Sequence, residues 1–413
     1  MSATEIPGRG VESDAISQPV LPAYGGACIA SVTRALLRIV CGSYPRVPGA
    51  ATAAGGNGGA AGGNGGTEGG SGEIPDWVPA PARDASQVVL LVLDGLGWEQ
   101  LQNDPALAPT LTGGAGGKIT SVAPTTTATC LTSISTGLVP AEHGVVGYRL
   151  AVEDTEILNV LKWRTGRGDA RTTIRPREFQ PHPAFGGYET TEVTRSEFRA
   201  TGFTAAHLDG ARLVGWQVPS TLVVEVRRLL RENTPFIEAY YDGLDKVAHE
   251  HGIGEHYDAE LRFVDRMVAD LIDVLPAGAC LVVTSDHGQV NVGRSVEMPA
   301  NEVLDASRLI SGEGRFRWFH AHPGAEKDLE AAASGAHGHN AWVRTLEQML
   351  DEGWFGGALS KRVASRVGDV ALVAREPVAF LDPADTGETR LAARHGSLTP
   401  TEMYVPLLGF ERN

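Results

Sequence analysis

Six acidic and imidazole side chains of this sequence could bind a divalent metal, and each stands near the end of an apolar run or in a loop that can return to one. They are Asp94, Asp245, His249, Asp286, His287 and His395. Carboxylate oxygens and imidazole nitrogens are donors that zinc and manganese accept. Each residue alone is a weak indication, because Asp-Gly and Asp-His-Gly also occur in ordinary turns. Their coincidence favours metal-assisted chemistry.

The spacing of these residues suits a shared site. Asp245 and His249 are four residues apart, so a helical turn would bring both side chains to one face. Asp286 and His287 offer two kinds of ligand within one turn. His395 stands in a loop before a strand-like apolar run, which allows it to return to the same edge.

Residues 118–148 add a hydroxyl nucleophile to this set. A strand-like ITSV is followed by Pro124 and by a threonine-rich segment that is expected to begin a helix. At a helix N-terminus a hydroxyl lies among unpaired backbone N–H groups, which favour developing negative charge. Thr125, Thr126 and Thr127 are therefore candidates both for capping the helix and for attacking a substrate.

Three apolar runs of strand length must position the acidic residues. The runs are Val88–Leu93, Pro235–Tyr241 and Cys280–Thr284, and they lead to Asp94, Asp245 and Asp286 respectively. Continuous apolar runs of this length are typical of strands buried on both faces of a parallel sheet. The carboxyl ends of such strands form the edge at which ligands bind in open α/β folds.

Helical patterns alternate with these strands. Apolar residues recur at three- and four-residue intervals in Cys28–Ile39, Thr127–Thr136, Ser220–Glu232 and His256–Leu275. We therefore expect an α/β sandwich with a mainly parallel central sheet and helices on both faces. Two stretches, at about 148–218 and 291–390, interrupt the alternation and are long enough to form a cap lobe.

Composition divides the chain further. Residues 1–15 are polar and unpatterned and are expected to be a disordered N-terminus, before a single catalytic domain over residues 16–413. Within that domain, residues 48–73 are rich in glycine. Glycine loses much backbone entropy on ordering and offers no side chain to bury, so this segment is predicted to be a disordered loop.

Charge and hydropathy restrict the partners. The 413 residues carry a formal net charge of −15, without a Lys/Arg cluster that would bind nucleic acid or an anionic membrane. No apolar run approaches the roughly 18 residues that span a bilayer, and we expect a soluble, cytoplasmic protein. Its widely spaced cysteines are expected to be free thiols. Sequence does not indicate the oligomeric state. An anionic substrate requires a local positive centre, which bound metal ions would supply.

In these motifs the chain resembles the type I phosphodiesterase and nucleotide pyrophosphatase family of the alkaline phosphatase superfamily. The resemblance covers most of Val88 to Leu408 and rests on LVLDG, PTTTATCLTSISTGLVPAEHG, DKVAHEHG, TSDHG and the HG of RHGSLTP. It implies an alkaline-phosphatase-like fold and a two-metal site, usually zinc, although manganese tolerates the same ligands. The sulfatase branch is disfavoured because its Cys-x-Pro-x-Arg pattern is missing.

The family's site residues carry over by position. Asp94, Thr127, Asp286 and His287 would surround one metal, and Asp245, His249 and His395 would hold the other. Thr127 matches the nucleophile when the block is aligned on Thr136-Gly137-Leu138 and His143-Gly144, and a shift of one position would make it Thr126.

The resemblance implies hydrolysis of phosphodiester or pyrophosphate bonds in a small phosphoester, such as a nucleotide, through a phospho-threonine intermediate. Two positions depart from nucleotide-cleaving members: Ala128 stands where an aromatic residue commonly follows the nucleophile, and Tyr148 stands near an expected asparagine. A phosphomonoesterase or a phosphonate hydrolase of the same superfamily is the first alternative. A non-catalytic metal-binding protein is the second.

Overall fold

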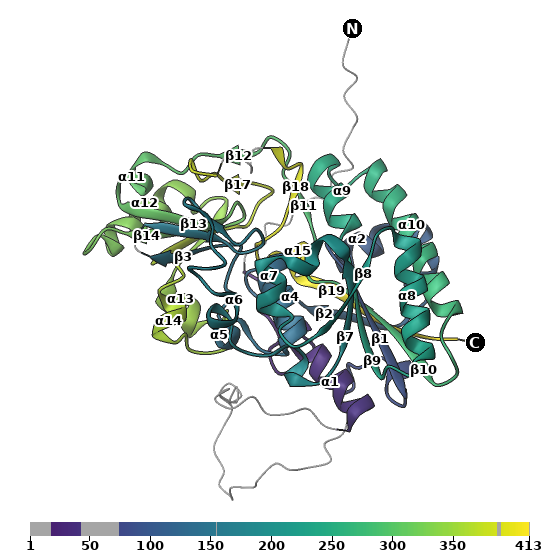
Figure 1. Ribbon diagram of the computed structural model, residues 1–413. Coiled ribbons are helices and arrows are strands. Elements are labelled where there is room, and N and C mark those ends of the chain that lie inside the picture. Colours follow the sequence, from purple (N-terminus) through teal and green to yellow (C-terminus); the bar gives the residue numbers. More distant parts are fainter. Residues whose placement is uncertain (1–17, 43–73, 154, 386–389, 413) are drawn as a thin grey trace, which may run out of the picture.

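The central element of the protein is a seven-stranded sheet (Figure 1). The structure is a computed structural model that describes residues 18–42, 74–153, 155–385 and 390–412. The strand order is β2-β19-β10-β1-β9-β7-β8, and only β19 runs against the others. The strands are β1 (Gln87–Leu93), β2 (Ala115–Thr120), β7 (Thr191–Arg195), β8 (Arg212–Trp216), β9 (Phe236–Tyr241), β10 (Ala279–Thr284) and β19 (Tyr404–Glu411). The predicted mainly parallel sheet is thereby confirmed.

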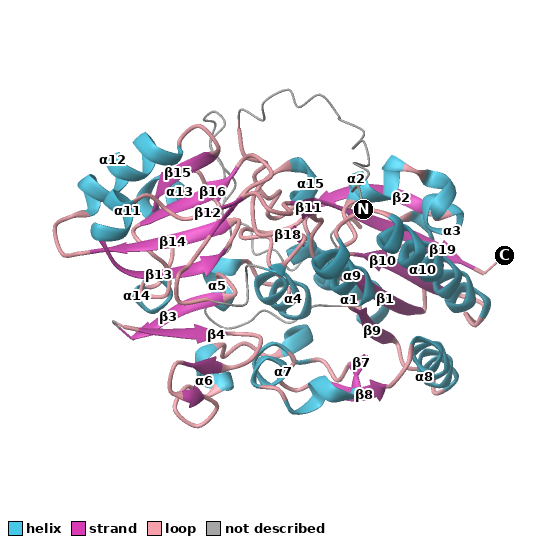
Figure 2. Cartoon of the chain, turned by 90° about the horizontal axis from the view of Figure 1, so that it is seen from above, coloured by secondary structure: helices cyan, strands magenta, loops and turns pink. Residues whose placement is uncertain are grey.

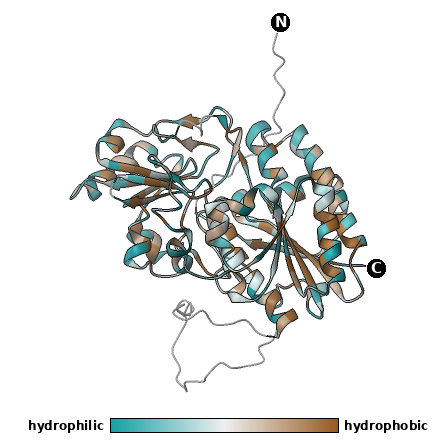
Figure 3. Ribbon diagram, in the orientation of Figure 1, coloured by the Kyte–Doolittle hydropathy of each residue, from teal (hydrophilic) through white to brown (hydrophobic). Residues whose placement is uncertain are grey.

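Helices cover both faces of this sheet (Figures 1 and 2). One face carries α8 (Pro219–Arg231), α9 (Gly243–His251) and α10 (Glu255–Asp273), and the other carries α1 (Ile29–Cys41), α4 (Thr127–Thr136) and α7 (Gly202–His207). Alternate residues of β1 pack into two different apolar clusters, as expected for a strand buried on both faces. The strands are accordingly brown, or hydrophobic, in Figure 3.

The predicted helices agree with the observed ones. Helix α4 spans Thr127–Thr136 as predicted, and α1, α8 and α10 begin and end within two residues of the predicted limits. The α/β architecture with helices on both faces is therefore confirmed.

The stretches predicted as cap insertions contain two further four-stranded sheets. The first comprises β3 (Arg149–Glu153), β4 (Glu156–Asn159), β5 (Arg164–Thr165) and β6 (Gly168–Asp169); the second comprises β13 (Ser307–Glu313), β14 (Phe316–Ala321), β15 (Ala341–Thr345) and β16 (Val370–Ala374). Strands β3 and β13 lie side by side (Figure 2), so the two sheets form one lobe beside the central sheet.

The predicted limit of the first cap insertion, 148–218, was wrong. Strands β7 and β8 lie inside this interval and pair in the central sheet, where β7 is the neighbour of β9. Sequence reasoning missed them because TEVTR, unlike the continuous apolar run of β1, places a carboxylate and threonines among buried positions. The cap part of this interval therefore ends before Thr191.

Two other predictions concern segments outside this architecture. The stretches predicted to be disordered, 1–15 and 48–73, lie outside the described residues. Among the residues that the structure describes, no helix has the length and apolar composition needed to cross a membrane.

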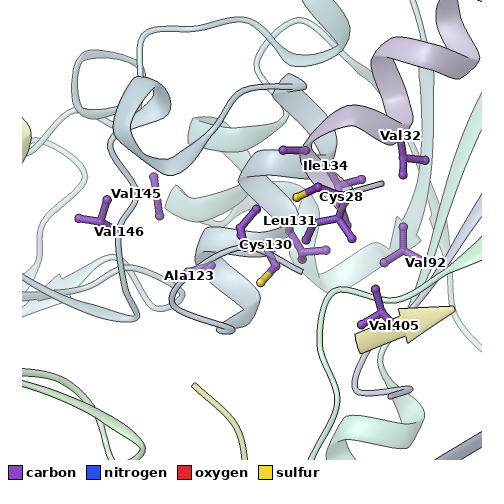
Figure 4. Close-up of a cluster of buried hydrophobic side chains, with 14 of the residues drawn as sticks. Cys28, Val32, Val92, Ala123, Cys130, Leu131, Ile134, Val145, Val146 and Val405 are labelled. Atoms are coloured by element: carbon purple, nitrogen blue, oxygen red, sulfur yellow. The ribbon is translucent and has the colours of Figure 1, made fainter. Parts of the chain in front are cut away.

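The core between the sheet and α4 contains three of the four cysteines, Cys28, Cys130 and Cys280, of which Figure 4 labels the first two. Cys130 of α4 and Cys28 beside α1 are buried among aliphatic side chains that include Val92 of β1. All four cysteines are free thiols, as predicted, and Cys41 is the least buried of them. This packing holds the N-terminus of α4 against the sheet.

A buried ion pair joins the β13–β14 turn to α15 (Pro400–Met403), the short helix after the loop that carries His395. The Arg315 guanidinium donates to both carboxylate oxygens of Glu402, each at 2.8 Å, and both side chains have no exposed surface. The backbone N–H of Ser397 donates to the same carboxylate at 2.9 Å. The pair therefore fixes the second cap sheet relative to the site loop.

Breaking this pair is expected to destabilise the protein strongly. In Arg315→Met the Glu402 carboxylate stays buried without its partner, which costs about 3–5 kcal/mol of unfolding free energy. Chemical denaturation would measure the loss. The control is Arg175→Met, which removes an ion pair to Glu178 whose two side chains are both 69% exposed. Equal stability of the two variants would contradict the prediction.

Candidate active site

The carboxyl ends of three adjacent parallel strands deliver the predicted acidic residues. In β1 and β10, Val92 pairs with Thr284, so the chain reaches Asp94 and Asp286 at the same edge of the sheet. Strand β9 lies on the other side of β1 and passes directly into α9, whose first turn contains Asp245. The three carboxylates therefore converge although about 190 residues separate Asp94 from Asp286.

A first group of possible ligands forms around Asp245. Its Oδ1 lies 3.2 Å from Nε2 of His249, one helical turn along α9, and 3.8 Å from Nε2 of His395. One ligand atom from each of these three residues lies within 4.8 Å of the others. The residues are half-buried, so the group is open on one side.

A second group shares Asp245 with the first. Ligand atoms of Asp94, Asp245 and His287 lie within 4.8 Å of one another. Nε2 of His287 is 3.5 Å from Asp94 Oδ1 and 3.3 Å from Asp286 Oδ2. The rings of His287 and His395 stack with centroids 3.6 Å apart, which connects the two groups. All six carboxylate and imidazole residues singled out from the sequence thus lie together.

The three imidazoles are oriented by the same kind of hydrogen bond, from Nδ1 to a backbone carbonyl. Nδ1 of His249 donates to the carbonyl oxygen of Ala393 at 2.9 Å, and Nδ1 of His395 donates to that of Thr125 at 2.8 Å. Nδ1 of His287 lies 3.1 Å from the carbonyl oxygen of Gly288. A carbonyl accepts only, so each Nδ1 carries a proton, and Nε2 is the ring nitrogen that is left to bind a metal.

Hydrogen bonds also orient the carboxylates. Tyr240 donates its hydroxyl proton to Oδ2 of Asp94, and the Gly95 N–H donates to Oδ1 of Asp286 at 3.1 Å. Gln289 donates to Asp245. Sequence reasoning missed Tyr240 and Gln289, because a tyrosine in an apolar strand and a glutamine after a turn carry no distinctive pattern.

Two buried carboxylate oxygens of the cluster have no hydrogen-bond partner. They are Oδ1 of Asp94 and Oδ2 of Asp286. Burying an ionised oxygen without a partner is costly, so such an atom binds a proton or a cation. Together with the three imidazole Nε2 atoms, these oxygens form a donor set that fits divalent cations such as zinc.

Burial shifts the pKa of several of these groups. Desolvation raises the pKa of Asp94 well above its usual value, and the neighbouring Asp286 and Asp245 raise it further. Desolvation lowers the pKa of His395 well below its usual value, and His287 and His249 lower it further. His395 is therefore neutral at pH 7 and can offer its lone pair to a metal.

Thr127 lies beside this cluster at the first position of α4. Its Oγ1 is 3.2 Å from Nε2 of His287, and its side chain lines the neighbouring cavity. Thr126 is the N-cap residue and does not line the cavity, whereas Thr125 donates its hydroxyl proton to the carbonyl oxygen of Ser397. Of these three threonines, Thr127 alone lines the cavity.

A cavity of about 220 Å³ opens from the cluster between the sheet and helices α4 and α7. Asp94, Thr127 and Asp245 are among the residues that line it. The remaining lining residues include Phe198, Phe203, Tyr240, His207, Glu192 and Glu238. The last two carboxyls were also missed from the sequence, although a glutamate inside the otherwise apolar FIEAYY was a visible signal.

The two positions that depart from the family pattern do not face this cavity. Ala128 is fully buried and offers no stacking surface. The phenol oxygen of Tyr148 accepts a hydrogen bond of 2.6 Å from the Asn159 amide, and Tyr148 is not among the lining residues. The aromatic surface of the cavity comes instead from Phe198, Phe203 and Tyr240.

The central sheet with helices on both faces is an alkaline-phosphatase-like fold. Residues 88–398 match the family model of type I phosphodiesterase / nucleotide pyrophosphatase, and the chain belongs to that family. The protein is therefore a phosphoric ester hydrolase of a metal-dependent family. No curated protein matches the chain in sequence.

Solved structures confirm the fold. Murine ectonucleotide pyrophosphatase / phosphodiesterase 5 is similar with a TM-score of 0.60 at 16% identity, over 79% of this chain and 88% of that one. The same values apply to an inactive threonine-to-alanine variant of the murine protein in complex with AMP. The human protein is similar with a TM-score of 0.58 at 15% identity, over the same shares of the two chains.

Proposed function

We propose that this protein hydrolyses phosphodiester or pyrophosphate bonds at a site for two divalent metal ions, with Thr127 as the nucleophile. The proposed ligands are Asp94, Thr127, Asp286 and His287 for one ion, and Asp245, His249 and His395 for the other. The observation that carries the proposal is the Thr127 hydroxyl, which lies 3.2 Å from His287 and lines the cavity beside the cluster. Zinc suits the mixed nitrogen and oxygen donors, and manganese accepts the same set.

The residues of the chain perform the reaction in two displacements. Thr127 Oγ1 loses its proton to solvent and bonds to phosphorus, while the bond from phosphorus to the leaving oxygen breaks and that oxygen takes up a proton. Water then cleaves the phospho-threonine and restores the hydroxyl. When bound, the metal ions supply positive charge that lowers the pKa of a nearby hydroxyl and offsets the charge of the phosphate.

The N-terminus of α4 assists the same step. Thr127 is the first residue of this helix, where backbone N–H groups lack intrahelical partners. These groups and the helix dipole favour negative charge on the phosphoryl oxygens. Tyr240 and Gln289 hold Asp94 and Asp245 in place through their hydrogen bonds. The chain therefore positions the nucleophile and the ligands before substrate binds.

A nucleotide is the substrate we propose to test first. One similar structure is a complex of the murine relative with AMP, and the cavity offers aromatic faces from Phe198, Phe203 and Tyr240. These residues would replace the aromatic residue that the chain lacks at Ala128. Aromatic faces stack on nucleobases, each stack contributing about 1–3 kcal/mol.

Three p-nitrophenyl substrates test the reaction: bis-p-nitrophenyl phosphate, p-nitrophenyl phosphate and the p-nitrophenyl ester of thymidine monophosphate. We expect kcat/KM for the diesters to exceed that for the monoester by about tenfold or more, equivalent to about 1.4 kcal/mol. A further gain for the thymidine ester would support a nucleotide. Preference for the monoester would contradict the proposal and assign a phosphomonoesterase.

Chelation is expected to abolish turnover and lower stability together. A metal that binds the folded state alone at 100 times its dissociation constant stabilises the protein by about 2.7 kcal/mol. Treatment with a chelator should remove this amount, and zinc or manganese should restore both activity and the unfolding midpoint. The proposed site would be contradicted if the protein kept full activity although metal analysis detected no remaining ion.

A further inference from the structure

Two glutamates lie side by side in the wall of the cavity. Glu192 of β7 and Glu238 of β9 are partners in the parallel register of the central sheet. Side chains of registered residues on adjacent parallel strands point to the same face. Both side chains line the cavity that begins at Thr127, and each residue is 3% exposed.

Neither glutamate is fully hydrogen-bonded. Oε2 of Glu192 and Oε2 of Glu238 are buried and have no hydrogen-bond partner. Burial raises the pKa of Glu192 to about 8, and burial together with the charge of Glu192 raises the pKa of Glu238. A structural role in the core would leave these oxygens paired, because unsatisfied buried polar atoms are costly.

The walls of the cavity do not supply a positive charge to balance the two glutamate carboxylates. Among the described residues that line it, Lys246 is the only lysine or arginine, and its ammonium pairs with Asp242 at 2.7 Å. Burial lowers the pKa of His207 to about 4, so this imidazole is neutral at pH 7. Phe198 and Tyr240 add aromatic faces that favour a cation.

We propose that Glu192 and Glu238 form a subsite for a protonated primary amine on the substituent of the phosphoester. The N–H groups of an ammonium would donate to the two unpartnered Oε2 atoms, and its charge would balance the carboxyl pair in the buried cavity. The proposal rests on the proposed function, because it assigns the substituent of the ester that Thr127 attacks. It names a substrate class: phosphodiesters of amino alcohols or of other amine-bearing groups.

The test compares two diesters of the same size. They are 2-aminoethyl p-nitrophenyl phosphate and n-propyl p-nitrophenyl phosphate, in which a methyl group replaces the ammonium. We expect kcat/KM of the metal-loaded enzyme to be about tenfold or more higher for the aminoethyl ester, as for a hydrogen-bonded charge pair. In Glu192→Gln and in Glu238→Gln this ratio should fall towards one. Glu302→Gln, at an exposed position of α11 (Asn301–Asp305), is the matched control and should keep the ratio of the unmodified protein.

Failure of the subsite can be distinguished from failure of the proposed function. If bis-p-nitrophenyl phosphate is hydrolysed but both test esters react equally, the subsite is refuted and the hydrolase stands. If none of the three diesters is hydrolysed, the proposed function is refuted, and ligand-observed NMR with n-propylammonium and n-propanol decides the subsite. Binding of the amine that is lost in both glutamine variants would support it, and equal binding of the alcohol would overturn it.

Discussion

Thr127→Ala is expected to lose phosphodiester hydrolysis by about a thousandfold or more in kcat/KM, equivalent to about 4 kcal/mol of transition-state stabilisation. The variant lacks the Oγ1 that lies 3.2 Å from His287 and lines the cavity, but it keeps the six carboxylate and imidazole side chains. Its metal content should therefore stay close to that of the unmodified protein. Steady-state hydrolysis of bis-p-nitrophenyl phosphate and metal analysis of the same preparation measure both quantities.

Two variants of the same segment distinguish loss of the nucleophile from misfolding of the protein. Thr127→Ser restores a hydroxyl and should recover measurable turnover, because serine can form the same kind of phosphoester. Thr126→Ala removes the neighbouring hydroxyl, whose residue does not line the cavity, and should retain most of the activity. If Thr127→Ala kept full activity while Thr126→Ala lost it, the nucleophile would be Thr126. Full activity in both would assign the attack to water.

Asp245→Asn is expected to reduce metal binding more than any other single substitution in the cluster. Asp245 belongs to both groups of ligand atoms, with His249 and His395 in one and with Asp94 and His287 in the other. Substitution of a residue that only hydrogen-bonds to a metal ligand lowers metal affinity about 10–100-fold. Loss of a carboxylate that belongs to both groups should therefore lower metal affinity at least about a hundredfold. Competition with a fluorescent zinc chelator would measure the affinity, and activity should fall in parallel.

The matched control is Asp270→Asn, at an exposed position of α10. This variant changes the net charge by the same amount but touches no ligand atom, so its metal affinity should be unchanged. A second comparison, Gln289→Ala, removes the amide that donates to Asp245. It should lower affinity by about 10–100-fold, less than Asp245→Asn. Equal affinity in all three variants would remove Asp245 from the metal site.

Strands β1 and β10 were predictable because each is a continuous apolar run that leads to a carboxylate. The hydropathy of Val88–Leu93 and Cys280–Thr284 predicts burial on both faces, and burial on both faces requires neighbouring strands and covering helices. Strands β7 and β8 were not predictable in this way. TEVTR interrupts its buried positions with polar residues, and two of them, Glu192 and Thr194, line a cavity and do not pack in an apolar core.

The kinds of ligand were also predictable, since they depend on residue type and short-range spacing. Asp245 and His249 share a helix face because they are one turn apart, and Asp286 and His287 follow a strand directly. Their assignment to particular metal ions stays a prediction. The roles of Tyr240 and Gln289 were not predictable, because their hydrogen bonds to Asp94 and Asp245 span 146 and 44 residues of sequence.

The sequence by itself determined the family, the parallel α/β architecture and the set of residues able to bind metal. These features depend on runs of apolar residues and on motifs of a few residues, so they can be predicted from residues that are close together in the sequence. Only the tertiary structure decided that Asp245 lies between both ligand groups and that each imidazole presents Nε2. It also decided that Glu192 and Glu238 lie side by side on adjacent strands. Such pairings depend on the register of strands and on loops closing over long stretches of chain, which no local pattern specifies.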